Sequence, residues 1–114
     1  MLNQSTALDL AFQALADPAR RAMLERLSAG PASVSELAAP LTMSMPAVLQ
    51  HLAVLEHAGL ATSRKSGRVR TCEIGTARFA EVQGWLNARR AEWEARFDRL
   101  DEYLNELREG DKNG

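Results

Sequence analysis

The 114-residue sequence contains one cysteine, four prolines, seven glycines and only 5% aromatic residues. A single thiol excludes an intramolecular disulfide framework and any zinc site built on cysteine pairs. The low proline and glycine content excludes collagen-like and low-complexity chains. No apolar stretch approaches the roughly 20 residues that cross a bilayer, and the first residues lack the basic start of a signal peptide. We therefore expect one cytoplasmic globular domain over residues 1–114, without a membrane partner.

The net charge is also small, because 14 lysines and arginines stand against 15 acidic residues, which gives −1. This average argues against nucleic-acid binding, for which a basic domain is the simple expectation. The charges are unevenly distributed, however. The window 60–72 has four cations and no acidic residue, so it carries +4 and the rest of the chain −5. Such a cluster suits contact with phosphates or the minor groove, or it protects a solvated strand edge from pairing.

The first part of the chain predicts two helices from the helical spacing of its apolar residues. One covers residues 5–16 and the other residues 18–28. Asp17 and Pro18 are the start signal of the second helix, as an N-cap followed by proline at the first helical position.

The next two helices are predicted from capping residues at their ends. Ser33 and Glu36 have the spacing of a capping box, which predicts a short helix over residues 34–40. A fourth helix is predicted over residues 44–58, with Gly59 as its left-handed C-cap.

The periodicity then changes to that of strands. Alternation predicts two short strands over residues 60–64 and 69–74, joined by a turn over residues 65–68. A long helix is predicted over residues 76–109, with apolar residues at intervals of seven and two more four positions later. This apolar seam consists of Phe79, Leu86, Trp93, Phe97, Leu100, Leu104 and Leu107.

Two helices joined by a short turn and followed by a basic hairpin form a winged helix-turn-helix. The sequence resembles the ArsR-type winged-helix transcriptional repressors, in a subgroup without the metal-sensing cysteines. The matching segments are residues 15–21, 34–38 and 44–60, and the resemblance covers about residues 8–74. It implies a mainly α fold of order ααααββα, with a helix-turn-helix over 33–58 and a β-wing over 60–74.

The resemblance further implies a DNA-binding repressor on a partly palindromic operator, with helix 44–58 in the major groove and the wing on the backbone or minor groove. Gln50 can pair with adenine, and Met45 and Ala47 can contact thymine methyl groups. His51 either donates to a phosphate or has a structural role. Relatives often carry more polar groups on this helix, so we expect the hairpin to supply most of the affinity. The candidate DNA contacts are Ser44, Met45, Ala47, Gln50, His51, Arg64, Lys65, Arg68 and Arg70.

The resemblance also implies a homodimer held by the first and last helices, residues 5–16 and 76–109. The seam of the last helix has more apolar surface than one small domain leaves exposed, which agrees with that role. The alternative is that its aromatic residues pack only within the subunit. The candidate interface residues are Leu8, Phe12, Leu86, Trp93, Phe97, Leu100 and Leu104.

No cofactor, metal or particular inducer is indicated. The predicted third helix has no cysteine and the last helix has no histidine, so the sequence lacks the ligand sets of metal sensors. Cys72 is either a buried strand residue or a redox-sensing thiol. The sequence has no phosphate-binding loop and no catalytic triad spacing, and we expect no enzyme. The alternative function is a protein-interaction module that uses the charged face of the long helix.

Overall fold

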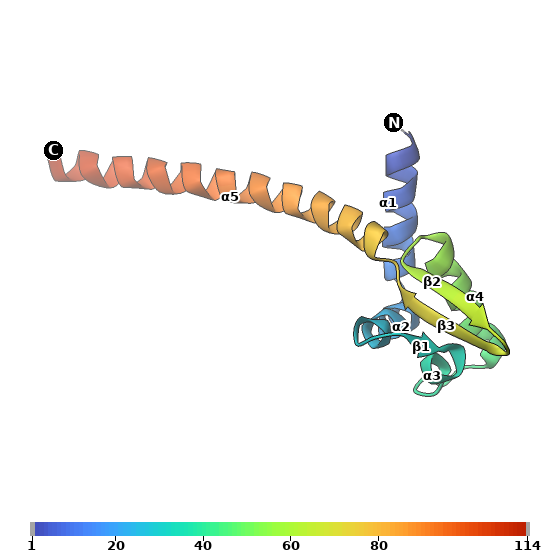
Figure 1. Ribbon diagram of the computed structural model, residues 1–114. Coiled ribbons are helices and arrows are strands. Elements are labelled where there is room, and N and C mark those ends of the chain that lie inside the picture. The colour runs from blue at the N-terminus through green and yellow to red at the C-terminus, as the bar shows by residue number, and fades with distance from the viewer. Residues whose placement is uncertain (1, 114) are drawn as a thin grey trace. The chain divides into compact units, whose positions relative to one another are not determined.

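A computed structural model describes residues 2–113, which divide between Val82 and Gln83 into two compact units. The chain is mainly helical, with a small three-stranded antiparallel sheet (Figure 1). The elements in order are α1 (Leu2–Leu15), α2 (Pro18–Ser28), β1 (Ala32–Ser33), α3 (Val34–Ala38), α4 (Met45–His57), β2 (Ala61–Ser66), β3 (Val69–Ile74) and α5 (Thr76–Asn113). The predicted winged helix-turn-helix order is confirmed, with one additional strand.

The predicted starts of α2, α3 and α4 are confirmed by their side-chain caps, whereas α1 begins at Leu2 and ends at Leu15 instead of spanning the predicted residues 5–16. The carboxylate of Asp17 accepts from the backbone N–H of Arg20 at 3.0 Å at the start of α2. Ser33 and Glu36 form both halves of a capping box at α3, at 3.1 and 3.3 Å. Ser44 caps α4 by accepting from the backbone N–H of Ala47. Each cap satisfies an amide that has no partner inside its own helix.

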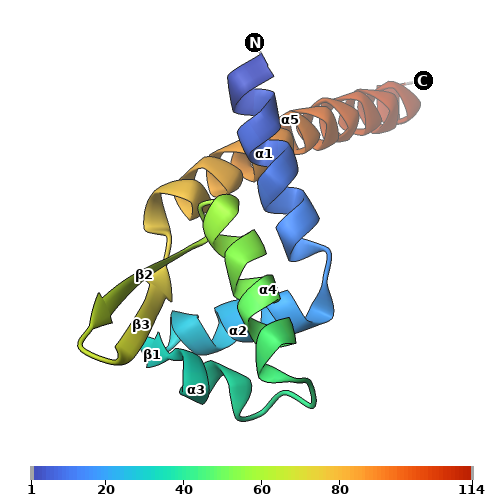
Figure 2. The same ribbon diagram turned by 90° about the vertical axis from the view of Figure 1, so that its right-hand side faces the viewer.

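Helix α3 is shorter than predicted, since it ends at Ala38 instead of residue 40. Ala39 still has helical backbone angles, but Pro40 has no N–H to donate to the carbonyl of Glu36, so the helical hydrogen bonds end there. The turn that follows leads into α4, and Figure 2 shows α3 and α4 next to one another with the β2–β3 hairpin beside them.

The core of the first unit is formed by apolar side chains that α2, α3 and α4 turn toward one another. Met23 of α2, Leu37 of α3 and Leu52 and Leu55 of α4 are almost completely buried. Leu60 extends this cluster toward the sheet. Burial of a side chain of this size stabilises the fold by about 1.5–3 kcal/mol. The same packing sets the position of α4, which is the second helix of the helix-turn-helix.

The sheet has the strand order β1-β3-β2. Strand β1 was not predicted, because two residues are too short to show the alternation of a strand. It pairs with β3 through Ala32 and Cys72. The predicted strand over 60–64 is wrong in its extent, since β2 runs to Ser66 and pairs there with Val69. The hairpin therefore turns over two residues, and its first one, Gly67, has a φ of 61°, as type II′ turns require.

Two glycine backbones touch where α4 ends and where β3 passes into α5. Gly59 has a φ of 76° and is the predicted left-handed cap of α4. Gly75 donates its N–H to the carbonyl of Leu60 at 2.8 Å. A Cβ atom at Gly75 would lie 2.0 Å from the carbonyl oxygen of Gly59. Only glycine at residue 75 permits this approach of the two segments.

Helix α5 runs to Asn113, four residues beyond the predicted end. Its start belongs to the first unit, where Phe79 and Val82 pack against the core. From residue 83 it forms the second unit, and almost every side chain over residues 83–110 is exposed. None of the helices within residues 2–113 has an apolar run of the length that membrane crossing requires.

Candidate nucleic-acid interface

Helix α4 has one buried face and one exposed face. Val48, Leu52 and Leu55 point into the core. The exposed face begins at Ser44 and includes Met45 and Leu49, whose side chains are 43% and 40% exposed. Large apolar groups in such positions offer contacts to thymine methyl groups more readily than to phosphates. Of the candidate DNA contacts on this helix, Ser44, Met45 and Gln50 are exposed, whereas Ala47 is half-buried.

Gln50 also lies beside α1. It lines a mostly apolar groove of about 430 Å³ together with Leu10 and Gln13 of α1 and Val54 and His57 of α4. The Gln50 amide is therefore exposed to solvent and also lies at the edge of this groove.

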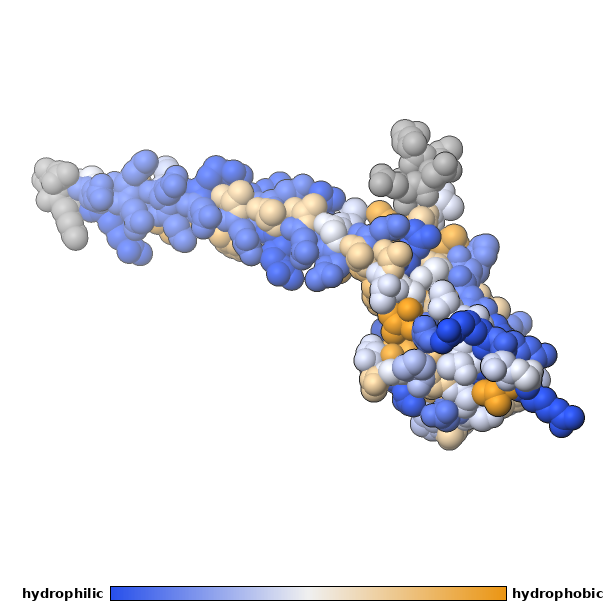
Figure 3. All heavy atoms as spheres, viewed as in Figure 1, coloured by the Kyte–Doolittle hydropathy of each residue, from blue (hydrophilic) through white to orange (hydrophobic). Residues whose placement is uncertain are grey.

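The hairpin cations fall into two groups. Lys65 and Arg68 are exposed, and neither side chain forms an ion pair or hydrogen bond with the side chains that the structure describes. Arg64 is 79% exposed and pairs with Glu73 on the neighbouring strand at 2.7 Å. Figure 3 shows strongly hydrophilic residues gathered over the hairpin and its tip. The tip thus offers two unpaired positive charges to an anionic partner.

Arg70 has a different environment from the one that the sequence predicted. Its Nη2 donates to both carboxylate oxygens of Glu56, at 2.7 and 2.8 Å, and its Nε donates to the hydroxyl of Ser63 at 2.9 Å. Ser63 in turn donates to Glu56 at 2.7 Å. These half-buried contacts join β3 and β2 to the C-terminal part of α4. Arg70 thus braces the wing against α4, and its DNA contact remains a prediction.

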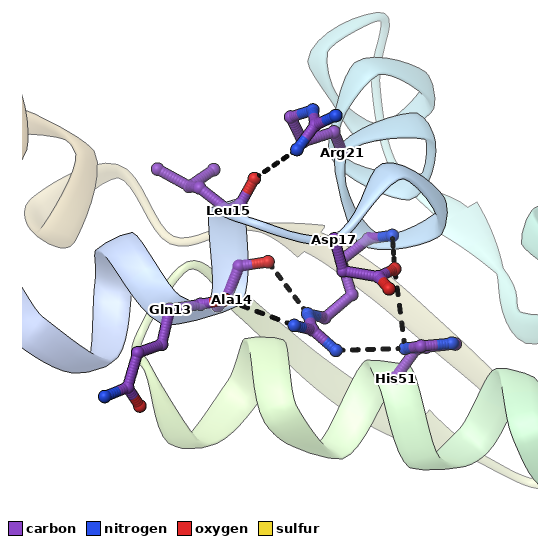
Figure 4. A network of polar contacts seen from close by, with 7 residues as sticks. Gln13, Ala14, Leu15, Asp17, Arg21 and His51 are labelled. Atoms are coloured by element: carbon purple, nitrogen blue, oxygen red, sulfur yellow. Dashed lines mark hydrogen bonds and ion pairs between the residues drawn. The ribbon is translucent and has the colours of Figure 1, made fainter.

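His51 lies in a polar network between the α1–α2 turn and α4 (Figure 4). Its side chain is 23% exposed, and its Nδ1 is 3.2 Å from Nη1 of Arg20 and 3.8 Å from Oδ2 of Asp17. The backbone N–H of Arg20, with smaller contributions from His51 and the Arg20 side chain, holds the pKa of the Asp17 carboxyl below its ordinary value despite some desolvation. The structural role left open for His51 therefore has a partner, Arg20, which no spacing in the sequence singled out.

Cys72 is completely buried in the middle of β3, where it pairs with Ala32 on one side and Ser63 on the other. Burial raises the pKa of the thiol, and the charge of Arg70 only partly opposes this effect. Of the two roles considered for Cys72, the structure shows the buried strand residue. A thiol sensor needs the opposite, an accessible thiol with a lowered pKa.

We expect Cys72 to react with a thiol reagent about 100-fold more slowly in the native protein than in denaturant. The raised pKa leaves little thiolate at neutral pH, and burial keeps the reagent out until the sheet opens. Absorbance during reaction with a disulfide reagent measures both rates, and the unfolded chain is the control. Rapid labelling of the native protein would restore the sensor hypothesis.

The second unit has an apolar face. Its six seam side chains are between 41% and 57% exposed: Leu86, Trp93, Phe97, Leu100, Leu104 and Leu107. The rings of Trp93 and Phe97 stack with centroids 6.0 Å apart, and the Arg96 guanidinium lies over Trp93. On α1, Leu8 packs against the core of the first unit, and Phe12 is 38% exposed. The seam is therefore a continuous apolar surface on the described α5.

A helix-turn-helix whose second helix is exposed at its start, followed by a hairpin with free cations, defines the winged helix-turn-helix class of DNA-binding proteins. A helix-turn-helix domain family model matches residues 15–64. The chain belongs to the ArsR family of helix-turn-helix transcriptional regulators.

Three similarities support this assignment. The crystal structure of the ArsR family transcriptional regulator RHA00566 is 49% identical with a TM-score of 0.74, over 79% of this chain and 93% of that one. The HTH-type transcriptional regulator Rv2034 of Mycobacterium tuberculosis is 47% identical over 66% of this chain and 70% of that protein. An ArsR-like regulator from Rhodococcus sp. RHA1 is 31% identical with a TM-score of 0.71, over 86% and 92% of the two chains.

A more distant similarity concerns the fold alone. The DNA-binding domain of Mb0332 from Mycobacterium bovis, described as a homodimeric winged helix-turn-helix, is 21% identical with a TM-score of 0.61, over 73% of this chain and 79% of that one.

Proposed function

We propose that this transcriptional regulator is a dimeric repressor that binds a partly palindromic operator. Helix α4 enters the major groove, and the β2–β3 wing contacts the backbone or the minor groove. The observation that carries this proposal is the pair of unpaired, exposed cations Lys65 and Arg68 on the same unit as the exposed start of α4. Repression agrees with the role of a relative in Bacillus subtilis, the transcriptional repressor SdpR, which is 25% identical over 66% of this chain and 83% of that protein.

The wing supplies most of the affinity in this proposal. Each cation that neutralises a phosphate releases condensed counterions, and this gain is independent of the base sequence. Arg64 and Arg70 are already paired with Glu73 and Glu56, so they have less charge to offer. Lys65 and Arg68 can bind a phosphate without breaking an ion pair within the protein.

Base reading is the task of the exposed face of α4. Gln50 can donate to and accept from adenine, and Ser44 can bond either a base or a phosphate. Met45 and the small Ala47 are suited to thymine methyl groups. With so few polar groups on this face, the shape and deformability of the operator contribute to its selection.

The second copy is proposed to pack on the seam of α5 and on Phe12 and Leu8 of α1. In a monomer, the apolar seam of α5 would be exposed to water, and soluble monomers rarely expose apolar patches of this size. A dimer also explains how a short recognition helix gains enough contacts, because two copies read half-sites about 34 Å apart.

A salt titration of operator binding tests the role of the wing. We expect Arg68→Ala and Lys65→Ala each to reduce the slope of log K against log salt by about 2, since a dimer loses two phosphate contacts of about 0.9 each. The probe is the DNA upstream of the protein's own coding sequence, followed by fluorescence anisotropy. Arg99→Ala on α5 removes the same charge far along the chain and is the matched control.

The outcomes separate the two candidate functions. An unchanged slope in both wing variants removes these cations from the phosphate contacts. Absence of any complex with the wild-type protein at low salt favours the alternative function, a protein-interaction module that uses the charged face of α5.

A further inference from the structure

Arg20 is held in place by the end of α1. Its Nε donates to the carbonyl of Ala14 at 2.8 Å, and its Nη2 donates to the carbonyl of Gln13 at 3.1 Å. These carbonyls belong to the last turn of α1, where helix carbonyls lack intrahelical partners. These two hydrogen bonds hold Nε and Nη2 of the planar guanidinium, and they therefore also orient its third nitrogen, Nη1.

The remaining guanidinium nitrogen of Arg20, Nη1, determines which ring nitrogen of His51 bears the proton. Nη1 of Arg20 lies 3.2 Å from Nδ1 of His51. A guanidinium has donors only, so Nδ1 must accept, and the proton of the neutral imidazole is then on Nε2. Oδ2 of Asp17 is 3.8 Å from Nδ1, which is beyond hydrogen-bond distance, and the same oxygen already accepts from the backbone of Arg20.

Nε2 points out of this network. Figure 4 shows the second ring nitrogen of His51 on the side of the ring away from the contacts with Arg20 and Asp17. His51 is partly exposed and follows Gln50 on α4. A fixed N–H donor therefore stands at the edge of the helix that is proposed to enter the major groove. A fixed donor gives up little conformational freedom on binding, which favours its use as a contact.

We propose that Arg20 is a positioning residue for DNA binding, which keeps Nε2–H of His51 available as a donor to a DNA phosphate. This inference rests on the proposed function. Its partner is one phosphate oxygen at each half-site, so a dimer makes the contact twice. The same guanidinium ties the end of α1 to α4, so the orientation of the donor depends on where α1 ends.

Two substitutions of His51 test which nitrogen matters. The amide nitrogen of glutamine reproduces the position of Nε2, whereas that of asparagine reproduces Nδ1. We expect His51→Gln to bind the operator within about threefold of the wild type and His51→Asn to lose about tenfold to 100-fold, the effect of one or two hydrogen bonds to a charged group. Comparable losses in both variants, with unchanged melting temperatures, would overturn the role of Nε2–H.

Arg20→Met tests the positioning. This substitution removes the guanidinium donors and keeps an unbranched side chain. We expect it to weaken operator binding about tenfold. Long-range ¹H–¹⁵N spectra of His51 should show protonation at Nε2 in the wild type and a mixture of both tautomers in this variant. The matched control is Arg21→Met, because Arg21 also donates to an α1 carbonyl, that of Leu15 at 2.7 Å, and has no contact with His51.

A double-mutant cycle separates positioning from a purely structural effect. The glutamine side chain of the His51→Gln variant has no tautomer to select, so adding Arg20→Met to it should cause no further loss beyond that of Arg21→Met. Additive losses, or a wild-type imidazole protonated at Nδ1, would overturn the inference while leaving the proposed function intact. Absence of wild-type DNA binding would overturn both.

Discussion

Replacing Gly75 with alanine is expected to lower the melting temperature by about 10–20 °C, which corresponds to roughly 3 kcal/mol for a chain of this size. The added Cβ would lie 2.0 Å from the carbonyl oxygen and 2.9 Å from the carbonyl carbon of Gly59. These are backbone atoms of the C-cap of α4, so they cannot rotate away as a side chain could. Relief requires β3 and the end of α4 to separate, which breaks the hydrogen bond from Gly75 to Leu60.

Gly84→Ala is the matched control, because no described atom beyond its neighbouring residues and the adjacent helix backbone lies within 4 Å of its added Cβ. Within α5, alanine in place of glycine should raise stability by up to about 1 kcal/mol. Thermal unfolding followed by circular dichroism at one fixed protein concentration measures both variants, since association affects stability. Equal melting temperatures for Gly75→Ala and the wild type would show that the two segments do not approach so closely in solution.

Introducing glutamate at both Leu100 and Leu104 is expected to convert the proposed dimer into a monomer. Both residues lie on the seam of α5, which spans about 80° of an ideal helix. They are 50% and 41% exposed in the single chain. If a second copy covers them, each glutamate becomes a buried charge without a partner, and the Kd of the dimer should rise by about 100-fold or more. Sedimentation velocity over a range of concentrations measures this change.

The control places the same two charges on the other side of α5. Ala91 and Ala95 are exposed and almost opposite the seam, so Ala91→Glu with Ala95→Glu should leave the Kd unchanged. Operator binding should fall with the seam variant only, because two half-sites then have to be bound by separate molecules. A seam variant that sediments as the wild type does would remove these residues from the interface.

The helices and their starts could be predicted because their signals are local. Asp17, Ser33 and Ser44 each accept a hydrogen bond from an amide three residues later, so residue spacing alone specifies the cap. Heptad spacing in α5 is local in the same sense. The buried residues of α4, Val48, Leu52 and Leu55, are spaced by three and four residues, which is also a local pattern.

The pairing of β1 with β3 could not be predicted, because it joins Ala32 to Cys72, forty residues later. The approach of Gly59 and Gly75 is likewise a property of two segments that meet only in the folded chain. Both depend on how the hairpin packs against the helices, and no spacing within either segment carries that information.

The charged residues of the candidate site also show which features follow from the sequence and which depend on the folded structure. The sequence by itself determined the order of the elements, the caps, the apolar seam and the four cations of the hairpin. Only the tertiary structure decided which cations remain free, because Glu56 of α4 and Glu73 of β3 come within 2.7 Å of Arg70 and Arg64 after folding. It also brought Arg20 to His51, thirty-one residues apart, and so assigned the imidazole its proton. Ion pairs and tautomers follow from distances between atoms, and those distances exist only once the chain has folded.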